Sequence, residues 1–539
     1  MECRGRKGIT LLVGLTSLLW TSATIEAQPN QGSQGAAGHG VAVAPVNPAT
    51  VPQIRAREPQ PRSLPRGHDI DLRQWKQLLQ PGSPLVPPDP SLIQDQAAPS
   101  TPPPLSASFA GISYTGWFPP DPHLAAGPTE LVAAVNTSFA FFTKTGTNLF
   151  QTTMQSWFNN VLPGGSAGFV VFDARVIYDT HLRRFILMAA ALKSSPFQAF
   201  WVLSFSPVSM ASGPWCNLAT DATLNGPTPT SNFNDYPRIG FDTRGIYLTA
   251  NMFNISTGAF QYVKTRVLNK TEIKAILNAG CSGGYNYYDF WDLRNPSDNS
   301  LAATVNPVVS YGEPAVEYLV NSRSATGSTI TLWRLAGANL IPSSPPTLTR
   351  VEIPVTSYTL PPDATQPGGA PAIDTGDARL FGAVLGAAGV WTAQTISCDF
   401  GGGPLESCIR VYVLDPDLQV QEWVNTLGAQ DLFYFYPDIA PDPFGNPVVA
   451  FSRSGASVFA EARFTRKRVA KANLNPDTAL LQAGAATYQQ IDSFGRNRWG
   501  DYFATAVDPD DPRTLWFVAE YVAAMNVWGT RIGATRFAP

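Results

Sequence analysis

One pattern recurs along residues 111–539 and constrains the fold more than any other feature of the chain. An Asp opens a short apolar stretch, a turn at Asp or Gly follows, and a second apolar stretch resumes. Copies return roughly every 50 to 70 residues. They begin at Asp121, Asp173, Asp235, Asn306, Asp377, Pro437 and Gly500, and the copy at Asn306 lacks the opening Asp. Another apolar-alternating stretch follows each copy, so each unit predicts a meander of three or four antiparallel strands.

Repeated all-β units of this size are typical of the blades of a β-propeller, where radial repetition protects the strand edges. Seven copies favour seven blades over residues 111–539, with six blades as the alternative. The stretch 111–118, GISYTGWF, has no partner in its own unit. We therefore expect it to pair with the final strand, near 530–537, and to close the ring. Two stacked β-sandwiches would not require the repeated Asp.

Residues 1–110 differ from the repeats in composition. Arg4, Arg6 and Lys7 precede an apolar stretch at 9–20, which predicts a signal peptide over 1–27. Residues 28–110 are rich in Pro, Gly, Ala and Gln and predict a disordered spacer, with a short helix expected at 69–80. No later stretch is long enough to span a membrane. We expect a secreted or periplasmic monomer.

Charge and cysteine content agree with export. The chain has 37 Lys+Arg against 40 Asp+Glu, which gives no reason to expect nucleic-acid binding. Four cysteines follow the predicted signal peptide, an even number that suits an oxidising compartment. Cys398 and Cys408 bracket a Gly-rich loop and predict a stapled hairpin, which leaves Cys216 to pair with Cys281. Four cysteines allow three pairings, so the alternatives stay open.

Two motifs resemble those of secreted bacterial proteins described as sialidase-like or uncharacterised β-propellers. The first is DYPRIGFD, from Asp235 to Asp242, and the second is NRWGDY, from Asn497 to Tyr502, with AVDP soon after. The resemblance implies the propeller fold and an extracellular setting but no agreed activity. The Asp-box turns and the Arg-Ile-Pro element of true sialidases are absent, since Gly240 follows Arg238-Ile239.

The opening residues of the innermost strands should converge at one mouth of a propeller channel. The candidates for ligand binding there are Asp173, Asp235, Asp377, Asp501, Arg175, Arg238, Arg379 and His123. One interpretation is that Asp–Arg pairs join neighbouring blades. A second is that the arginines hold an anionic group such as a sugar carboxylate through bidentate bonds. A third is that Asp121, Asp438 and Asp501 bind Ca²⁺, which prefers oxygen ligands.

Candidate catalytic groups are few. Glu313, Glu317 and Tyr318 lie in the copy without the opening Asp, and Glu520 and Tyr521 end a strand in the last copy. A retaining sialidase-like mechanism needs a Tyr activated by a Glu, an Asp as acid/base and an Arg cluster for the substrate carboxylate. The chain has no serine-hydrolase, zinc-protease or phosphate-loop motif.

Two classes of function follow from these observations. In the first, the propeller binds an extracellular glycan or protein at its channel mouth without catalysis. Aromatic-rich stretches such as 285–291 could then stack on sugar rings. In the second, a glycan-active hydrolase or lyase works at the Asp/Arg cluster with a Glu/Tyr pair.

Overall fold

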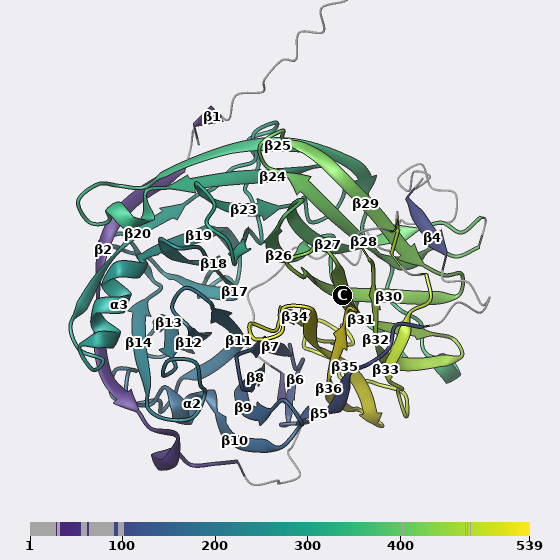
Figure 1. The fold of residues 1–539 in the computed structure, drawn as a ribbon, viewed down its shortest axis with the longest axis horizontal. Helices are drawn as coiled ribbons and strands as arrows, with labels where there is room; N and C mark the ends of the chain where they lie inside the picture. Colours follow the sequence, from purple (N-terminus) through teal and green to yellow (C-terminus); the bar gives the residue numbers. More distant parts are fainter. Residues whose placement is uncertain are drawn as a thin grey trace, which may run out of the picture.

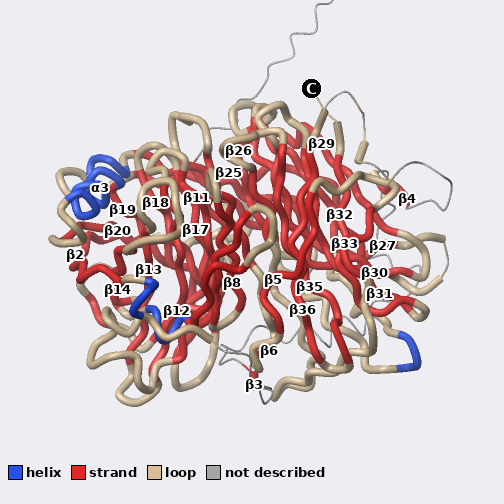
Figure 2. Tube along the Cα trace, turned by 60° about the horizontal axis from the view of Figure 1, so that its bottom comes forward, coloured by secondary structure: helices blue, strands red, loops and turns tan. Residues whose placement is uncertain are grey.

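A computed structural model of the chain describes residues 28–29, 33–54, 62–63, 91–94, 102–401, 403–468, 471, 473–474 and 476–538. The expected signal peptide over 1–27 and the expected helix at 69–80 lie outside these residues. Strands form nearly all the regular secondary structure of the described chain, and its sheets radiate from a common centre as in a β-propeller (Figure 1). Turned by 60°, the strands run side by side through the depth of the molecule (Figure 2).

Each repeat forms a four-stranded antiparallel sheet, which we call a blade and name by its innermost strand. The sheets have both faces packed against neighbours, so their strands are apolar on both sides rather than alternating. The blades are β7–β10 (His123–Ala126, Glu130–Val135, Ser138–Thr143, Asn148–Thr153), β11–β14 (Val170–Asp179, Arg184–Lys193, Gln198–Phe205, Trp215–Asp221) and β17–β20 (Asn232–Phe241, Gly245–Asn254, Phe260–Asn269, Gly284–Trp291). They continue with β21 and β23–β25 (Asn306–Pro307, Glu317–Asn321, Gly327–Ala336, Thr347–Tyr358) and β26–β29 (Leu380–Gly386, Gly389–Cys398, Glu406–Asp415, Val420–Gly428). The last are β30–β33 (Leu432–Pro441, Pro447–Gly455, Val458–Arg466, Ala479–Gln482) and β34–β36 with β5 (Ala504–Val507, Thr514–Ala524, Val527–Arg536, Ala107–Ser113).

The innermost strands contact one another in chain order. β7 touches β11, β11 touches β17, and the series runs on through β21, β26 and β30 to β34, which touches β7. The β34 blade takes its outermost strand from the other end of the repeats, because β5 pairs antiparallel with β36. This strand begins and ends earlier than the expected 111–118, since Ala107 pairs with Ala534 and Ser113 with Gly529. Trp117 and Phe118 form the short β6, which pairs with β3 (Arg62–Ser63) instead.

The expected spacer over 28–110 contains one long strand, so the prediction of disorder is wrong for this part. β2 (Gln34–Val46) lies between β14 and β20 and pairs antiparallel with both. It joins the outer edges of the β11 and β17 blades into one continuous sheet, and it runs along the rim of the ring in Figure 1. Short strands β1 (Gln28–Pro29) and β4 (Leu92–Gln94) add to β25 and β29.

Small residues in β2 allow this strand to pack although it carries little apolar area. Its glycines at 35, 38 and 40 lie against the rings of Tyr288, Tyr287 and Tyr285 on β20. A Cβ at Gly38 would lie only 2.2 Å from Cζ of Tyr287. Tyrosines of the partner strand therefore supply the apolar contact. Their rings lie directly over the three glycines, so no larger residue fits at these positions. A composition-based prediction of disorder misses a strand whose core residues belong to its neighbour.

Both expected disulfides are present. Cys216 on β14 pairs with Cys281, which follows helix α3 (Lys270–Asn278), and Cys398 on β27 pairs with Cys408 on β28. Helices are few; besides α3 the main one is the single turn α2 (Met154–Trp157). Within the described residues, no helix is long and apolar enough to cross a membrane.

The packing of β2 against tyrosines can be tested with one added side chain. We expect Gly38→Val to lower the free energy of unfolding by about 1–3 kcal/mol, because the new side chain overlaps Tyr287. Ala37→Val is the matched control, since Ala37 is exposed on the neighbouring position of the same strand. Urea unfolding of both variants measures the difference. Equal stability of the two would contradict the observed packing of β2.

Candidate functional site

The inner strands share a backbone irregularity where they begin. In every inner strand of the described chain except β34, one residue near or just before the start has a left-handed backbone, at φ values between 46° and 60°: Asp121, Asp173, Tyr236, Thr304, Gly382 and Tyr436. In β11, β17, β26 and β30 the pairing with the next strand shifts at this point, as in a β-bulge. Left-handed conformations are costly for a residue with a Cβ, least so for Asp and Asn. We call these positions the bulge residues.

Side chains of neighbouring segments hydrogen-bond to the backbone at these bulges. The N–H groups of Asp173, Thr304 and Tyr436 donate to side-chain oxygens of Asn136 (2.6 Å), Asn251 (2.8 Å) and Thr395 (3.1 Å). In the same way Asp173 accepts from the N–H of Tyr236 at 3.0 Å, and Asp121 from that of Asp501 at 2.5 Å. The acceptors Asn136, Asp173, Asn251 and Thr395 belong to the preceding blade in the contact order, whereas Asp121 belongs to the β7 blade, which follows β34. The bulges are thus stabilised between blades, not within one.

The residue two positions after each bulge faces the centre of the ring. These channel residues are His123, Arg175, Arg238, Asn306, Val384, Asp438 and, in β34, Ala504. All of them line one cavity of about 70 Å³. That is about half the volume of an engineered cavity of about 150 Å³ that holds benzene. The cavity therefore suits a few water molecules or one small charged group.

The sequence alignment of the repeats differs from the structural alignment by one or more residues in part of the chain. Asp173 is a bulge residue, but its equivalent on β17 is Tyr236 rather than Asp235. Asp438 is the equivalent of Arg175 and Arg238, not of Asp173. The Asp at the first turn of these repeats marks the alignment correctly, because the channel residue lies at a constant distance before it. Arg175, Arg238 and Asp438 each lie four residues before Asp179, Asp242 and Asp442, whose side chains accept turn N–H groups.

Arg175 and Arg238 contact the same two tyrosine rings. The Cζ atom of Arg175 lies 3.0 Å from the ring centroid of Tyr502 and 5.3 Å from that of Tyr236. For Arg238 the corresponding distances are 5.7 Å and 4.7 Å. The two rings meet edge to face, and both are buried, so they cover the arginines at the strand-start end of the channel. Cation–π contacts of this kind offset part of the cost of burying the guanidiniums.

The hydrogen bonds of the two arginines leave several donors without a protein acceptor. Arg175 is 1% exposed, and its Nε donates to the carbonyl of Pro237 at 2.9 Å. Its Nη1 and Nη2 are buried and have no hydrogen-bond partner among the described residues, and neither has Nε of Arg238. Arg238 donates from Nη2 to the hydroxyl of Tyr236 at 2.7 Å. Buried donors of a charged group are costly when unmade, so the site favours an acceptor between the arginines.

The cavity has an excess of positive charge. Burial, together with the charge of Arg175, lowers the pKa of Arg238 to about 10. Burial and the two arginines hold the pKa of His123 well below its ordinary value, so this imidazole is neutral near pH 7. Asp438 is the one carboxylate among the described residues that line the cavity. Burial raises its pKa to about 7, although Arg238, a hydrogen bond from the N–H of Thr505 and Arg175 lower it.

Arg379 and Asp377 lie near the cavity but do not line it. The Cζ of Arg379 is 4.5 Å from the ring centroid of Tyr236, so all three predicted arginines gather around this ring. Arg379 donates to both carboxylate oxygens of Asp377, at 2.6 Å and 2.8 Å. Both residues border a separate pocket together with Asn251 and Arg323. The predicted triad is therefore two channel arginines and one neighbour engaged by its own Asp.

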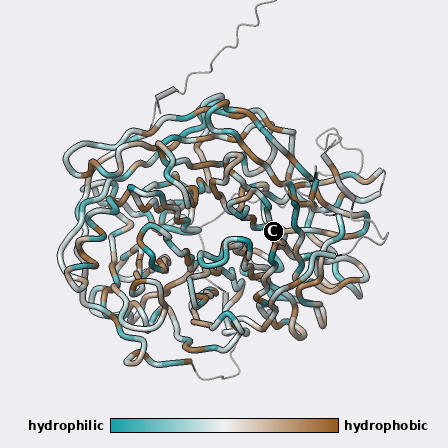
Figure 3. The backbone as a smooth tube through the Cα atoms, viewed as in Figure 1, coloured by the Kyte–Doolittle hydropathy of each residue, from teal (hydrophilic) through white to brown (hydrophobic). Residues whose placement is uncertain are grey.

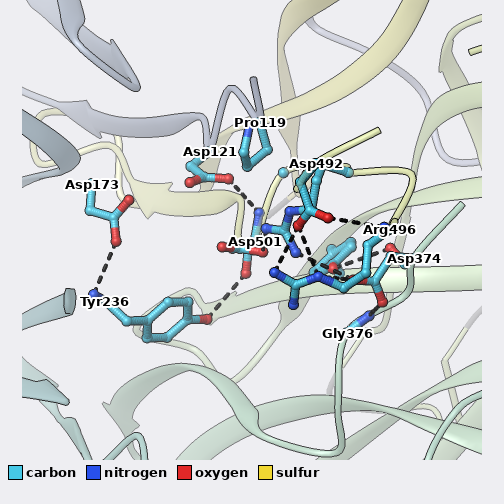
Figure 4. A network of polar contacts seen from close by, with 12 residues as sticks. Pro119, Asp121, Asp173, Tyr236, Asp374, Gly376, Asp492, Arg496 and Asp501 are labelled. Carbon is cyan, nitrogen blue, oxygen red and sulfur yellow. Dashed lines mark hydrogen bonds and ion pairs between the residues drawn. The ribbon is translucent and has the colours of Figure 1, made fainter. Parts of the chain in front are cut away.

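The predicted calcium ligands accept hydrogen bonds from the protein. Asp121 accepts from Asn136 and from the N–H of Asp501, both at 2.5 Å, and Asp501 accepts from Arg498 at 2.5 Å. Arg498 also pairs with Asp374 at 3.3 Å, and Tyr236 donates to the carbonyl of Asp501 (Figure 4). The loop before β34 that carries this network is hydrophilic and lies at the ring centre (Figure 3). The described residues contain no group of three His, Cys, Asp or Glu placed to hold a metal, and calcium stays a prediction.

None of the five candidate catalytic residues is among the described residues that line the cavity. Glu317 and Glu520 are fully buried and accept from the N–H groups of Val308 and Gly500, and burial raises the pKa of both well above the ordinary value. Tyr318 and Tyr521 follow them on the same strands, so each Tyr points to the opposite face of the sheet. Glu313 is exposed in the loop before β23.

The raised pKa of Asp438 predicts a pH dependence of stability. Its pKa is about 7 in the folded protein and about 3.9 in an unfolded chain, so between these values only the folded state keeps the proton. The contribution of Asp438 to stability is thus highest below pH 4 and decreases as pH rises through 7. We expect the stability of Asp438→Asn, relative to the unsubstituted protein, to increase between pH 4.5 and 8. Urea unfolding at several pH values, with exposed Asp417→Asn as control, measures it; parallel curves would contradict the assignment.

Known proteins resemble this chain in the course of the backbone but not in sequence. No protein-family model matches the sequence, and no curated protein sequence matches it. Among solved structures, an α-L-arabinofuranosidase of Fusarium graminearum is 8% identical, with a TM-score of 0.33 over 80% of this chain and 98% of that one. The sialidase of Trypanosoma rangeli is 8% identical, with a TM-score of 0.35 over 74% and 56%. The endosialidase of phage phi92 is 7% identical, with a TM-score of 0.37 over 81% and 69%.

Proposed function

We propose that this protein is an exported, seven-bladed β-propeller that binds an anionic ligand in its central channel. The blades are those begun by β7, β11, β17, β21, β26, β30 and β34, and the pairing of β5 with β36 closes the ring. Two disulfides in the described chain agree with an oxidising compartment. The sequence predicts an extracellular glycan or protein as the ligand, whereas the cavity itself constrains only the small anionic group that enters it.

The observation that carries this proposal is the buried guanidinium of Arg175. Both of its terminal nitrogens lack an acceptor among the residues that the structure describes, and the cavity beside them is large enough for one carboxylate or sulfate group. A guanidinium matches such groups through two parallel N–H···O bonds. Asp438 supplies less than one compensating charge near pH 7. An anion between Arg175 and Arg238 would relieve both the unmade hydrogen bonds and the repulsion between the two cations.

The arrangement favours binding over glycoside hydrolysis. Hydrolysis by the usual mechanism needs two carboxyl groups beside the scissile bond. The described residues that line the cavity supply one, Asp438, and a sugar ring is larger than the space beside it. We therefore place the hydrolase or lyase second among the two functions. An assay for new reducing ends or unsaturated sugars, run alongside glycan binding, distinguishes the two.

Arg175→Met tests the proposed anion site. We expect affinity for sulfate and acetate, measured by isothermal titration calorimetry at constant ionic strength, to decrease by about 2–4 kcal/mol. Thermal stability should be unchanged or higher, because the variant loses a buried charge and only one hydrogen bond to the protein. Unchanged anion affinity would contradict the proposal.

Arg266→Met is the matched control among buried arginines. Arg266 is equally buried but forms a bidentate pair with Asp289, at 2.7 Å for both oxygens. Removal of Arg266 leaves Asp289 buried and unpaired, so stability should decrease by about 3–5 kcal/mol. Anion affinity of the folded variant should stay the same. The two variants should therefore have opposite effects: Arg175→Met lowers anion affinity, and Arg266→Met lowers stability.

A further inference from the structure

The channel changes character along its length. At the strand-start end its walls carry Arg175, Arg238 and Asp438, beneath the rings of Tyr236 and Tyr502. Further along the same strands the lining is apolar: Ala125, Ile177, Ala506 and Val507. The positive charge is therefore confined to one end, and an apolar wall leads away from it toward the opposite mouth.

A second space opens at that mouth, where the turns of several blades meet. It has a volume of about 500 Å³, and we call it the vestibule. Its lining is mostly apolar, with Leu385, Ala387, Val507, Tyr311 and the prolines at 441, 443, 509 and 512. Two carboxylates border it, but Asp442 accepts from Phe444 and Asn446, and Asp508 accepts from Trp516 and pairs with Lys144 at 2.7 Å.

Tyr311 and Val507 line both the cavity and the vestibule, so the two spaces adjoin. Tyr311 follows β22 (Val309–Ser310), which lies between β17 and β26. A hydrogen bond joins its side chain to the backbone of Val507, at the end of β34 on another side of the ring. The ring also packs edge to face on Phe241 at 5.8 Å. Tyr311 therefore lies across the channel between the arginines and the vestibule.

We propose that the ligand is an amphipathic acid whose carboxylate binds Arg175 and Arg238 while its unbranched apolar chain passes Tyr311 into the vestibule. This inference rests on the proposed function, because it uses the same anion site. The ligand enters from the vestibule, because Tyr236 and Tyr502 cover the other end of the channel and are themselves only 5% and 1% exposed. The apolar walls, a single charged end and an adjoining apolar space match the two parts of such a molecule.

A series of linear carboxylates tests the inference. In β7, β17, β30 and β34 the strand ends three residues after the channel residue, which is about 10 Å of strand, or about eight carbons of extended chain. Acetate and butyrate should occupy the cavity alone, whereas octanoate and decanoate should reach the vestibule. We expect octanoate, measured by calorimetry below its micelle concentration, to bind at least tenfold more tightly than butyrate. Arg175→Met should weaken every member of the series.

Leu385→Asp places a charge in the vestibule without touching the arginines. It should reduce the affinity for octanoate and decanoate at least tenfold and leave that for acetate and butyrate unchanged. Leu418→Asp is the matched control, because Leu418 is 71% exposed and lies outside both spaces. Circular dichroism of both variants checks that the sheets are retained.

The outcomes separate this inference from the function on which it rests. If acetate and sulfate bind through Arg175 but affinity does not increase with chain length, the amphipathic ligand is wrong and the anion site stands. If affinity increases with chain length equally in Leu385→Asp, the chain does not lie in the vestibule and the inference is overturned. If neither sulfate nor any carboxylate binds, the proposed function fails and the inference fails with it.

Discussion

The structure depends on a hydrogen bond between blades at the start of the inner strands. At Asp173, Tyr236, Thr304 and Tyr436, a residue with a left-handed backbone donates its N–H to a side chain of the preceding blade. Without that acceptor, a buried N–H and a strained backbone would both add to the cost of folding. With it, the bulge orients the residue two positions later toward the ring centre. The same contact thus fixes the neighbouring blades and the chemical lining of the channel.

One glycine shows how closely this arrangement is packed. Gly382 is the bulge residue of β26, and a Cβ there would lie 2.5 Å from Oδ1 of Asp438. The absence of a side chain at 382 leaves room for the carboxylate that partly neutralises Arg238 and Arg175. Backbone geometry in one blade therefore determines the charge that the next blade can hold in the channel.

The sequence predicted the all-β repeats because four of them carry an Asp at the first turn, where its side chain accepts backbone N–H groups: Asp179, Asp242, Asp442 and Asp508. It also predicted the two disulfides and the gathering of Arg175, Arg238 and Arg379 around one place. Of its channel candidates, His123, Arg175, Arg238 and Asp438 line the cavity, whereas Asp173, Asp235, Asp377, Asp501 and Arg379 do not. A bulge shifts the register by one residue, and Asp235 and Tyr236 are equally plausible until the backbone is known. The strand β2 was missed because its apolar partners are tyrosines far along the chain.

The pairing of β2 with two blades has a mechanical consequence. One continuous sheet joins the β11, β17 and β26 blades through β2 and β22, whereas the β7, β21, β30 and β34 blades are separate sheets. The ring thus consists of a stiff arc, tied by main-chain hydrogen bonds, and a compliant arc, held by side-chain packing and the pairing of β5. Tyr311 extends from the stiff arc, and Val507, its partner, belongs to the compliant one. Breathing of the ring would concentrate at this junction, between the cavity and the vestibule.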